Sequence, residues 1–108
     1  MRTASLVLLT VLLAGCPRRG DTRVAGSDDA QLAAYEATLE ELRARRTTGG
    51  VSCTGRCDLA TRTCGVAEEL CAVVERNPER GDLPRRCVEA REKCAEATDD
   101  CTRCRARR

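Results

Sequence analysis

Cysteine is the residue type in this chain whose number and spacing point most directly to chemistry. The chain has 108 residues, of which nine are cysteine and none is histidine. Thiols pair as disulfides in oxidising compartments, and as thiolates they bind Zn²⁺ or the soft ion Cu(I). Cys16 lies near the start of the chain, and the others are Cys53, Cys57, Cys64, Cys71, Cys87, Cys94, Cys101 and Cys104.

The later cysteines mirror one another about residue 79. In three pairs the two cysteines lie equally far from residue 79: Cys57 with Cys101, Cys64 with Cys94, and Cys71 with Cys87. A fourth pair, Cys53 with Cys104, departs from this symmetry by one residue. Most neighbours within each half are seven residues apart, which is two helical turns, so they share one helix face. Seven residues rise about 10.5 Å along a helix, whereas a disulfide spans at most roughly 7 Å between Cα atoms. Partners must therefore lie on another helix, and the pattern predicts an antiparallel helical hairpin stapled by disulfides.

The outer register of this ladder stays open at this stage. The nested arrangement joins Cys53 to Cys104. Local closure would instead join Cys53 to Cys57 and Cys101 to Cys104. A half-heptad stagger would join Cys57 to Cys104 and Cys53 to Cys101.

Helices at about 56–76 and 83–105 would carry the cysteines, within a hairpin spanning 53–105. Disulfides require helices closer than the usual 8 to 10 Å, which small residues permit. Alanines follow the cysteines by three positions on the same face, at Ala60, Ala67, Ala90 and Ala97, although alanine is also simply a good helix former.

Turn residues separate the two helices of the hairpin. Pro78 is expected to end the first helix and Gly81 to permit a left-handed backbone. Asp82 could cap the second helix.

An additional amphipathic helix is predicted at 28–46, before the hairpin. Its apolar residues recur every three or four positions, at Leu32, Tyr35, Leu39 and Leu42. The first hairpin helix has a second apolar face, about 200° from its cysteines, formed by Leu59, Val66, Leu70 and Val73. We expect these faces to dock, giving an all-α fold of three helices. Alternatively, either face binds another protein or a second copy.

The first residues indicate a compartment. An apolar run over 6–13 leads into Leu13-Ala14-Gly15-Cys16, which resembles the bacterial lipobox. The resemblance implies that 1–15 is a lipoprotein signal peptide, removed before Cys16, which then carries diacylglycerol and usually an N-acyl chain. An ordinary secretory signal is the alternative. Residues 16–27 are polar and predict a flexible tether. Pro17 stands where some bacteria place an Asp retention signal, which favours the outer membrane.

The rest of the composition excludes several functions. Without histidine, and with Ser27 and Ser52 as the serines after position 16, no catalytic site is predicted, and neither is a cofactor. The 19 basic and 17 acidic side chains nearly balance, so nucleic-acid binding is not expected. Lipidation of Cys16 would leave eight cysteines, an even set for four disulfides.

The hairpin resembles two groups of proteins. One is the twin-cysteine helical hairpin of the mitochondrial intermembrane space, which has wider cysteine spacing. The other is an uncharacterised group of Cys-rich bacterial lipoproteins, similar over about 53–104. The sequence therefore predicts an envelope protein, lipid-anchored and facing the periplasm or the cell surface, acting as a non-enzymatic structural or protein-binding module. The alternative function is metal binding or storage, with thiolates of Cys53, Cys57, Cys101 and Cys104 as ligands.

Overall fold

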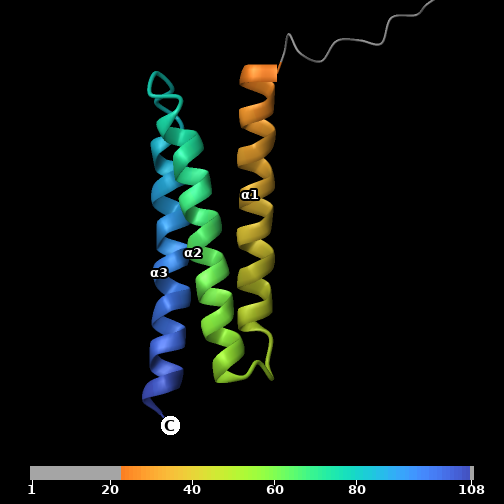
Figure 1. Ribbon diagram of the computed structural model, residues 1–108, viewed down its shortest axis with the longest axis vertical. Helices are drawn as coiled ribbons and strands as arrows, with labels where there is room; N and C mark the ends of the chain where they lie inside the picture. Colours follow the sequence, from red (N-terminus) through yellow and green to blue (C-terminus); the bar gives the residue numbers. More distant parts are fainter. Residues whose placement is uncertain (1–22, 108) are drawn as a thin grey trace, which may run out of the picture.

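Three α-helices make up the described part of the chain, residues 23–107 of the computed structural model (Figure 1). They are α1 at Arg23–Thr47, α2 at Cys53–Glu75 and α3 at Pro84–Ala106. No strand occurs among the described residues, so the fold is all-α, as predicted. Side chains are described from residue 27 onward. The predicted signal peptide and Cys16 lie outside the described residues.

The helices run in alternating directions, so the bundle has two distinct ends (Figure 1). We call the end where α1 begins, beside the α2–α3 turn at 76–83, the entry end. The opposite end, where the α1–α2 loop at 48–52 lies beside the last turns of α3, is the far end. A helix of this length spans about 35 Å, which is the approximate separation of the two ends.

Four disulfides join α2 to α3 along their whole length. Their Cα–Cα distances are 4.8, 4.5, 4.6 and 5.6 Å, from the entry end to the far end, for Cys71–Cys87, Cys64–Cys94, Cys57–Cys101 and Cys53–Cys104. These are the pairs of the nested ladder, and the structure contains neither local closure nor the staggered register. The two backbones approach closely at each of these cross-links.

Alanine makes this close approach possible. Ala67, Ala90 and Ala97 are at most 1% exposed, and Ala60 is also buried. Each has only a methyl group to place between the two backbones. The alanines therefore serve the hairpin contact, in addition to their helix propensity.

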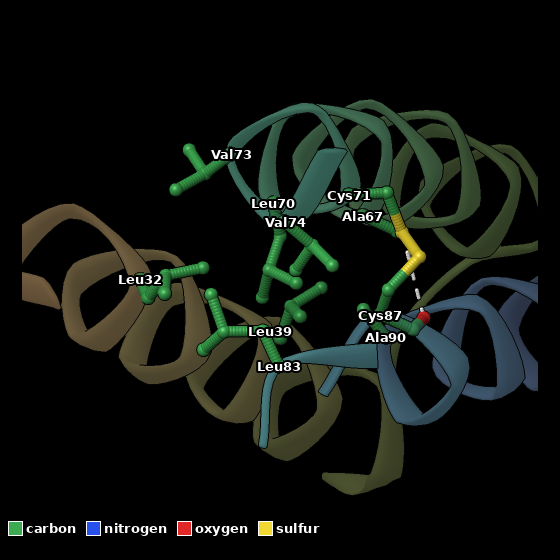
Figure 2. Close-up of a cluster of buried hydrophobic side chains, with 10 residues drawn as sticks. All are labelled: Leu32, Leu39, Ala67, Leu70, Cys71, Val73, Val74, Leu83, Cys87 and Ala90. Atoms are coloured by element: carbon green, nitrogen blue, oxygen red, sulfur yellow. Dashed lines mark hydrogen bonds between the residues drawn. A yellow bond between two sulfur atoms is a disulfide. The ribbon is translucent and has the colours of Figure 1, made fainter. Parts of the chain in front are cut away.

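The apolar stripe of α1 packs on the hairpin, and Figure 2 shows the centre of this contact. Most residues of the two predicted faces are buried: Leu32, Leu39, Leu42, Leu59, Leu70 and Val73. Tyr35 and Val66 are partly buried and pack against this core. The core also contains Val74 and, from the start of α3, Leu83, so α1 touches both hairpin helices rather than α2 alone.

The helix boundaries differ from the predicted ones at the start of the chain. Helix α1 begins at Arg23, not at residue 28, so the last part of the predicted tether is helical. The scarcity of apolar residues over 17–27 indicated a tether, but residues 23–27 contain no proline, and the helix that carries the leucine stripe extends back through them. At its other end α1 stops at Thr47, close to the predicted 46, and Gly50 in the following loop has a φ of 89°.

Two predictions for the α2–α3 turn are wrong. Gly81 does not have a positive φ. Asp82 does not cap α3, because its carboxylate accepts hydrogen bonds from Arg80, at 2.9 Å from Nη2. The N-cap position belongs to Leu83, and Pro84 begins the helix. Leu83 is fully buried, so packing of its side chain in the core fixes where α3 starts.

Leu39→Asp is expected to release α1 from the hairpin, since it places a charge at a site that is 1% exposed. Hydrogen–deuterium exchange should then become fast over 28–46 while α2 and α3 stay protected, because the disulfides hold them together. Ala37→Asp, on the exposed face of the same helix, is the control and should leave α1 protected. Unchanged protection of α1 in the Leu39 variant would contradict the docking.

Removal of the innermost disulfide should destabilise the bundle more than removal of the outermost. Cys71 and Cys87 are buried in the core, whereas Cys53 and Cys104 are partly exposed. The outermost bond closes only a small additional ring beyond Cys57–Cys101, so it restricts the unfolded chain least. We expect the double serine variant at 71 and 87 to lose about 3 kcal/mol, and the variant at 53 and 104 to lose less. Denaturant titration of both variants tests this order.

Candidate functional site

The cysteines form the chemically most distinctive feature, and in the structure all eight described ones are disulfide-bonded. The four proposed as metal ligands do meet at the far end, but Cys53 pairs with Cys104 and Cys57 with Cys101. A disulfide sulfur carries no thiolate charge and is a poor metal ligand. Within the described residues, no group of three or more His, Cys, Asp or Glu side chains is placed to hold a metal ion.

A shallow groove follows the seam between α1 and α2 in the half near the far end. Two adjoining hollows of about 420 and 470 Å³ form it, and both are lined by Arg45 and Arg62. Its apolar lining comes from Val51, Leu42, Leu59 and Val66. Leu42 and Leu59 are buried in the α1–α2 contact, whereas Val51 and Val66 are partly exposed, and the accessible lining of the hollow beside Val51 is mostly apolar. Most of the predicted binding face is used inside the bundle, and a small apolar hollow remains at the surface.

An ion-pair cluster at the entry end fixes the start of α1 to the α2–α3 turn. Asp28 accepts hydrogen bonds from Asn77 at 2.9 Å and from Arg76 at 3.2 Å. These bonds lower the pKa of the Asp28 carboxyl below its usual range, since they favour the charged form. Arg80 pairs with Asp29 at 2.5 Å as well as with Asp82.

A second set of ion pairs joins α1 to α3 along their parallel seam. Arg86 donates two hydrogen bonds to the carboxylate of Glu36, with 2.7 Å between Nε and Oε2. This contact lowers the pKa of Glu36, because the guanidinium favours the ionised carboxylate. Further pairs are Lys93 with Glu40 at 3.2 Å and Arg46 with Glu96 at 3.5 Å.

These α1–α3 contacts were missed from the sequence. On the back of α3, Glu89, Glu96 and Arg103 are all exposed, and Glu96 also reaches Arg46 of α1. The only available signal for these pairs was that charged positions of α1 have counterparts of opposite charge on α3. This signal becomes useful only once the two helices are known to lie side by side.

Nothing in these arrangements brings together a nucleophile and a base. Most of the polar contacts described above are ion pairs between carboxylates and guanidinium or ammonium groups, together with the amide–carboxylate hydrogen bond from Asn77 to Asp28. The chain contains no histidine. Disulfides, ion pairs and the shallow groove suit mechanical rigidity and binding. None of the three described helices is long and apolar enough to span a bilayer.

Acidification should weaken the Glu36–Arg86 contact. The pKa of Glu36 is lower in the folded protein than in the unfolded chain. The contribution of the ion pair to the free energy of unfolding is therefore complete above the unfolded-state pKa of about 4.3, and it is lost as the pH falls through the folded-state pKa. For a partly exposed pair we expect a loss on the order of 0.5 kcal/mol. Urea unfolding between about pH 5.5 and 3 should therefore show a smaller pH dependence in Glu36→Gln than in the wild type. Glu89→Gln, at an exposed site on α3, is the control and should follow the wild type.

Known proteins were compared with this chain at three levels. No protein-family model, no curated protein and no solved structure matches it.

Proposed function

We propose that this protein is a lipid-anchored component of the bacterial cell envelope and acts as a rigid, non-enzymatic structural or binding module. The nested disulfide ladder is the observation that carries the proposal. Four disulfides in a small chain are typical of an exported protein, because the cytosol keeps thiols reduced. The resemblance of Leu13-Ala14-Gly15-Cys16 to a lipobox supplies the anchor.

The composition of the bundle fits a molecule that depends on covalent cross-links. The chain contains one tyrosine, no phenylalanine and no tryptophan, so its core is built from leucine, valine and alanine. A small core of this kind gives limited stability on its own. Disulfides stabilise the bundle without large side chains, which suits a structural element kept in an oxidising compartment.

The geometry also gives the proposed anchor a direction. The chain enters the bundle at the start of α1, so lipid on Cys16 would hold the entry end nearest the membrane. The far end would then stand about 35 Å further away. Such a module presents its far end to partners in the periplasm or outside the cell, with the outer membrane favoured by Pro17.

The surfaces that remain exposed decide which partners, apart from the membrane, the bundle could bind. The two apolar faces that could have bound an envelope protein or a second copy are mostly buried within the bundle. A partner would therefore meet chiefly charged helix surfaces. We infer binding through charge rather than through a broad apolar face.

Lipidation is tested by expressing the full chain in a bacterium and fractionating the cells. We expect the protein in the membrane fraction, with a mature N-terminal peptide that begins at Cys16 and carries the mass of diacylglycerol and an acyl chain. Cys16→Ala is the matched control and should remain uncleaved and without lipid. A wild-type chain that is soluble in the periplasm and cleaved at another position would refute the anchor and favour an ordinary secretory signal.

A further inference from the structure

Charge is distributed unequally along the bundle. We divide residues 27–107 at the level of the Cys64–Cys94 disulfide. The half near the entry end, 27–40 and 63–95, has 6 basic and 11 acidic side chains. The half near the far end, 41–62 and 96–107, has 8 basic and 5 acidic side chains. A chain that is nearly neutral overall thus forms a bundle that is acidic at one end and basic at the other.

Several far-end arginines have no acidic partner. Four are paired: Arg45 with Glu41, Arg46 with Glu96, Arg56 with Asp100, and Arg103 with Asp99. The other four, Arg43, Arg62, Arg105 and Arg107, are exposed and form no ion pair within the described residues. They account for the surplus positive charge at this end.

Helix dipoles explain only part of this arrangement. Both α1 and α3 end here, and basic residues in a last turn interact favourably with the partial negative charge of a helix C-terminus. This accounts for Arg45, Arg46, Arg103 and Arg105. Helix α2 begins here, however, where its dipole disfavours a cation in the first turn, yet Arg56 lies in that region. Arg43 and Arg62 lie too far from a helix end for the dipole to explain them.

The surface around the outermost disulfide is also hollowed. One hollow of about 250 Å³ is lined by Arg56, Arg103 and Arg107, together with Asp100, which pairs with Arg56. A second, of about 300 Å³, is lined by Arg105 together with Asp58, Thr54, Cys53 and Cys57. Guanidinium groups bind carboxylates and phosphates through paired hydrogen bonds, and a hollow with arginine on its wall admits such a group.

We propose that the far end is a binding site for an anionic polymer that carries carboxylate or phosphate groups at intervals along its length. Arg105 and Arg107 lie one on the wall of each hollow, and they supply the unpaired positive charge that holds successive anionic groups of the polymer. The site lies at the end that the proposed lipid anchor would hold away from its own membrane, and this placement, though not the binding itself, rests on the proposed function.

A polymer fits this end better than a second membrane surface does. Protein segments that bind lipid surfaces commonly combine basic residues with exposed apolar side chains that enter the headgroup region. Val88 is the one large apolar side chain that is strongly exposed in the described chain, and it belongs to the half near the entry end. The far end offers charge without such an apolar side chain.

The proposal is tested with the mature lipidated chain reconstituted in neutral phosphatidylcholine vesicles. Fluorescent poly-glutamate is the carboxylate probe and fluorescent polyphosphate the phosphate probe. We expect at least one polymer to be recruited to the vesicles at low ionic strength and released as salt is added. Arg105→Glu/Arg107→Glu should weaken this recruitment at least tenfold. The control Arg85→Glu/Arg91→Glu makes the same charge change at exposed positions of the same helix near the entry end, and should change recruitment less than twofold.

Three results would overturn the proposal. The first is that neither polymer is recruited at low salt. The second is an equal loss in both double variants, which would show an effect of net charge and not of the far end. The third is that neither polymer is recruited, but the protein links these vesicles to anionic phosphatidylglycerol vesicles and Arg105→Glu/Arg107→Glu abolishes this link. That result would show that the far-end arginines bind a membrane surface. If Cys16 carries no lipid, the anchor fails separately, and polymer binding is measured with the same variants in solution.

Discussion

The short distance that a disulfide imposes between two helices determines the rest of this structure. Disulfide-bonded Cα atoms lie 4.5 to 5.6 Å apart along α2 and α3, and this contact contains the buried alanines at 60, 67, 90 and 97. A hairpin interface built mainly of alanine and cysteine buries little apolar volume. Large apolar side chains are found mainly on another face of α2, where Leu70 and Val73 meet the leucines of α1. The three-helix arrangement follows from the ladder, because the third helix supplies the core that a stapled hairpin lacks.

The same ladder makes the bundle suitable for presenting its two ends at a fixed separation. Cross-links at four levels prevent α2 and α3 from sliding or separating, and ion pairs at Asp28 and Glu36 hold α1 alongside them. The entry end is acidic and receives the chain from the proposed anchor, and the far end is basic. Rigidity and charge polarity together are consistent with the proposed binding role, in which orientation relative to the membrane would matter more than a pocket.

Regular spacing allowed the sequence to predict much of the fold, whereas irregular contacts could not be predicted. Seven-residue cysteine repeats on helices are compatible with few disulfide pairings. The leucine stripe of α1 can pack on only one apolar face of the hairpin. The outer register stayed open because Cys53 and Cys104 depart from the mirror by one residue. Asp82 was misassigned because burial of Leu83, not local capping, sets the start of α3. The arginines at the end of the chain are evident from the sequence, but the Glu36–Arg86 pair and the gathering of arginines from all three helices at the far end became visible only when the direction of α1 relative to α3 was known.

The central claim is the nested ladder, and disulfide mapping of the membrane-extracted protein tests it most directly. The protein is alkylated and digested after arginine and lysine without reduction, and the linked peptides are identified by mass. The account predicts no free thiol among the eight cysteines, with peptide 47–56, which contains Cys53, linked to peptide 104–105, which contains Cys104. A link from 47–56 to 57–62 or to 94–103 would contradict the nested register. Alkylated cysteines together with bound copper or zinc would contradict the ladder itself and favour metal binding by thiolates.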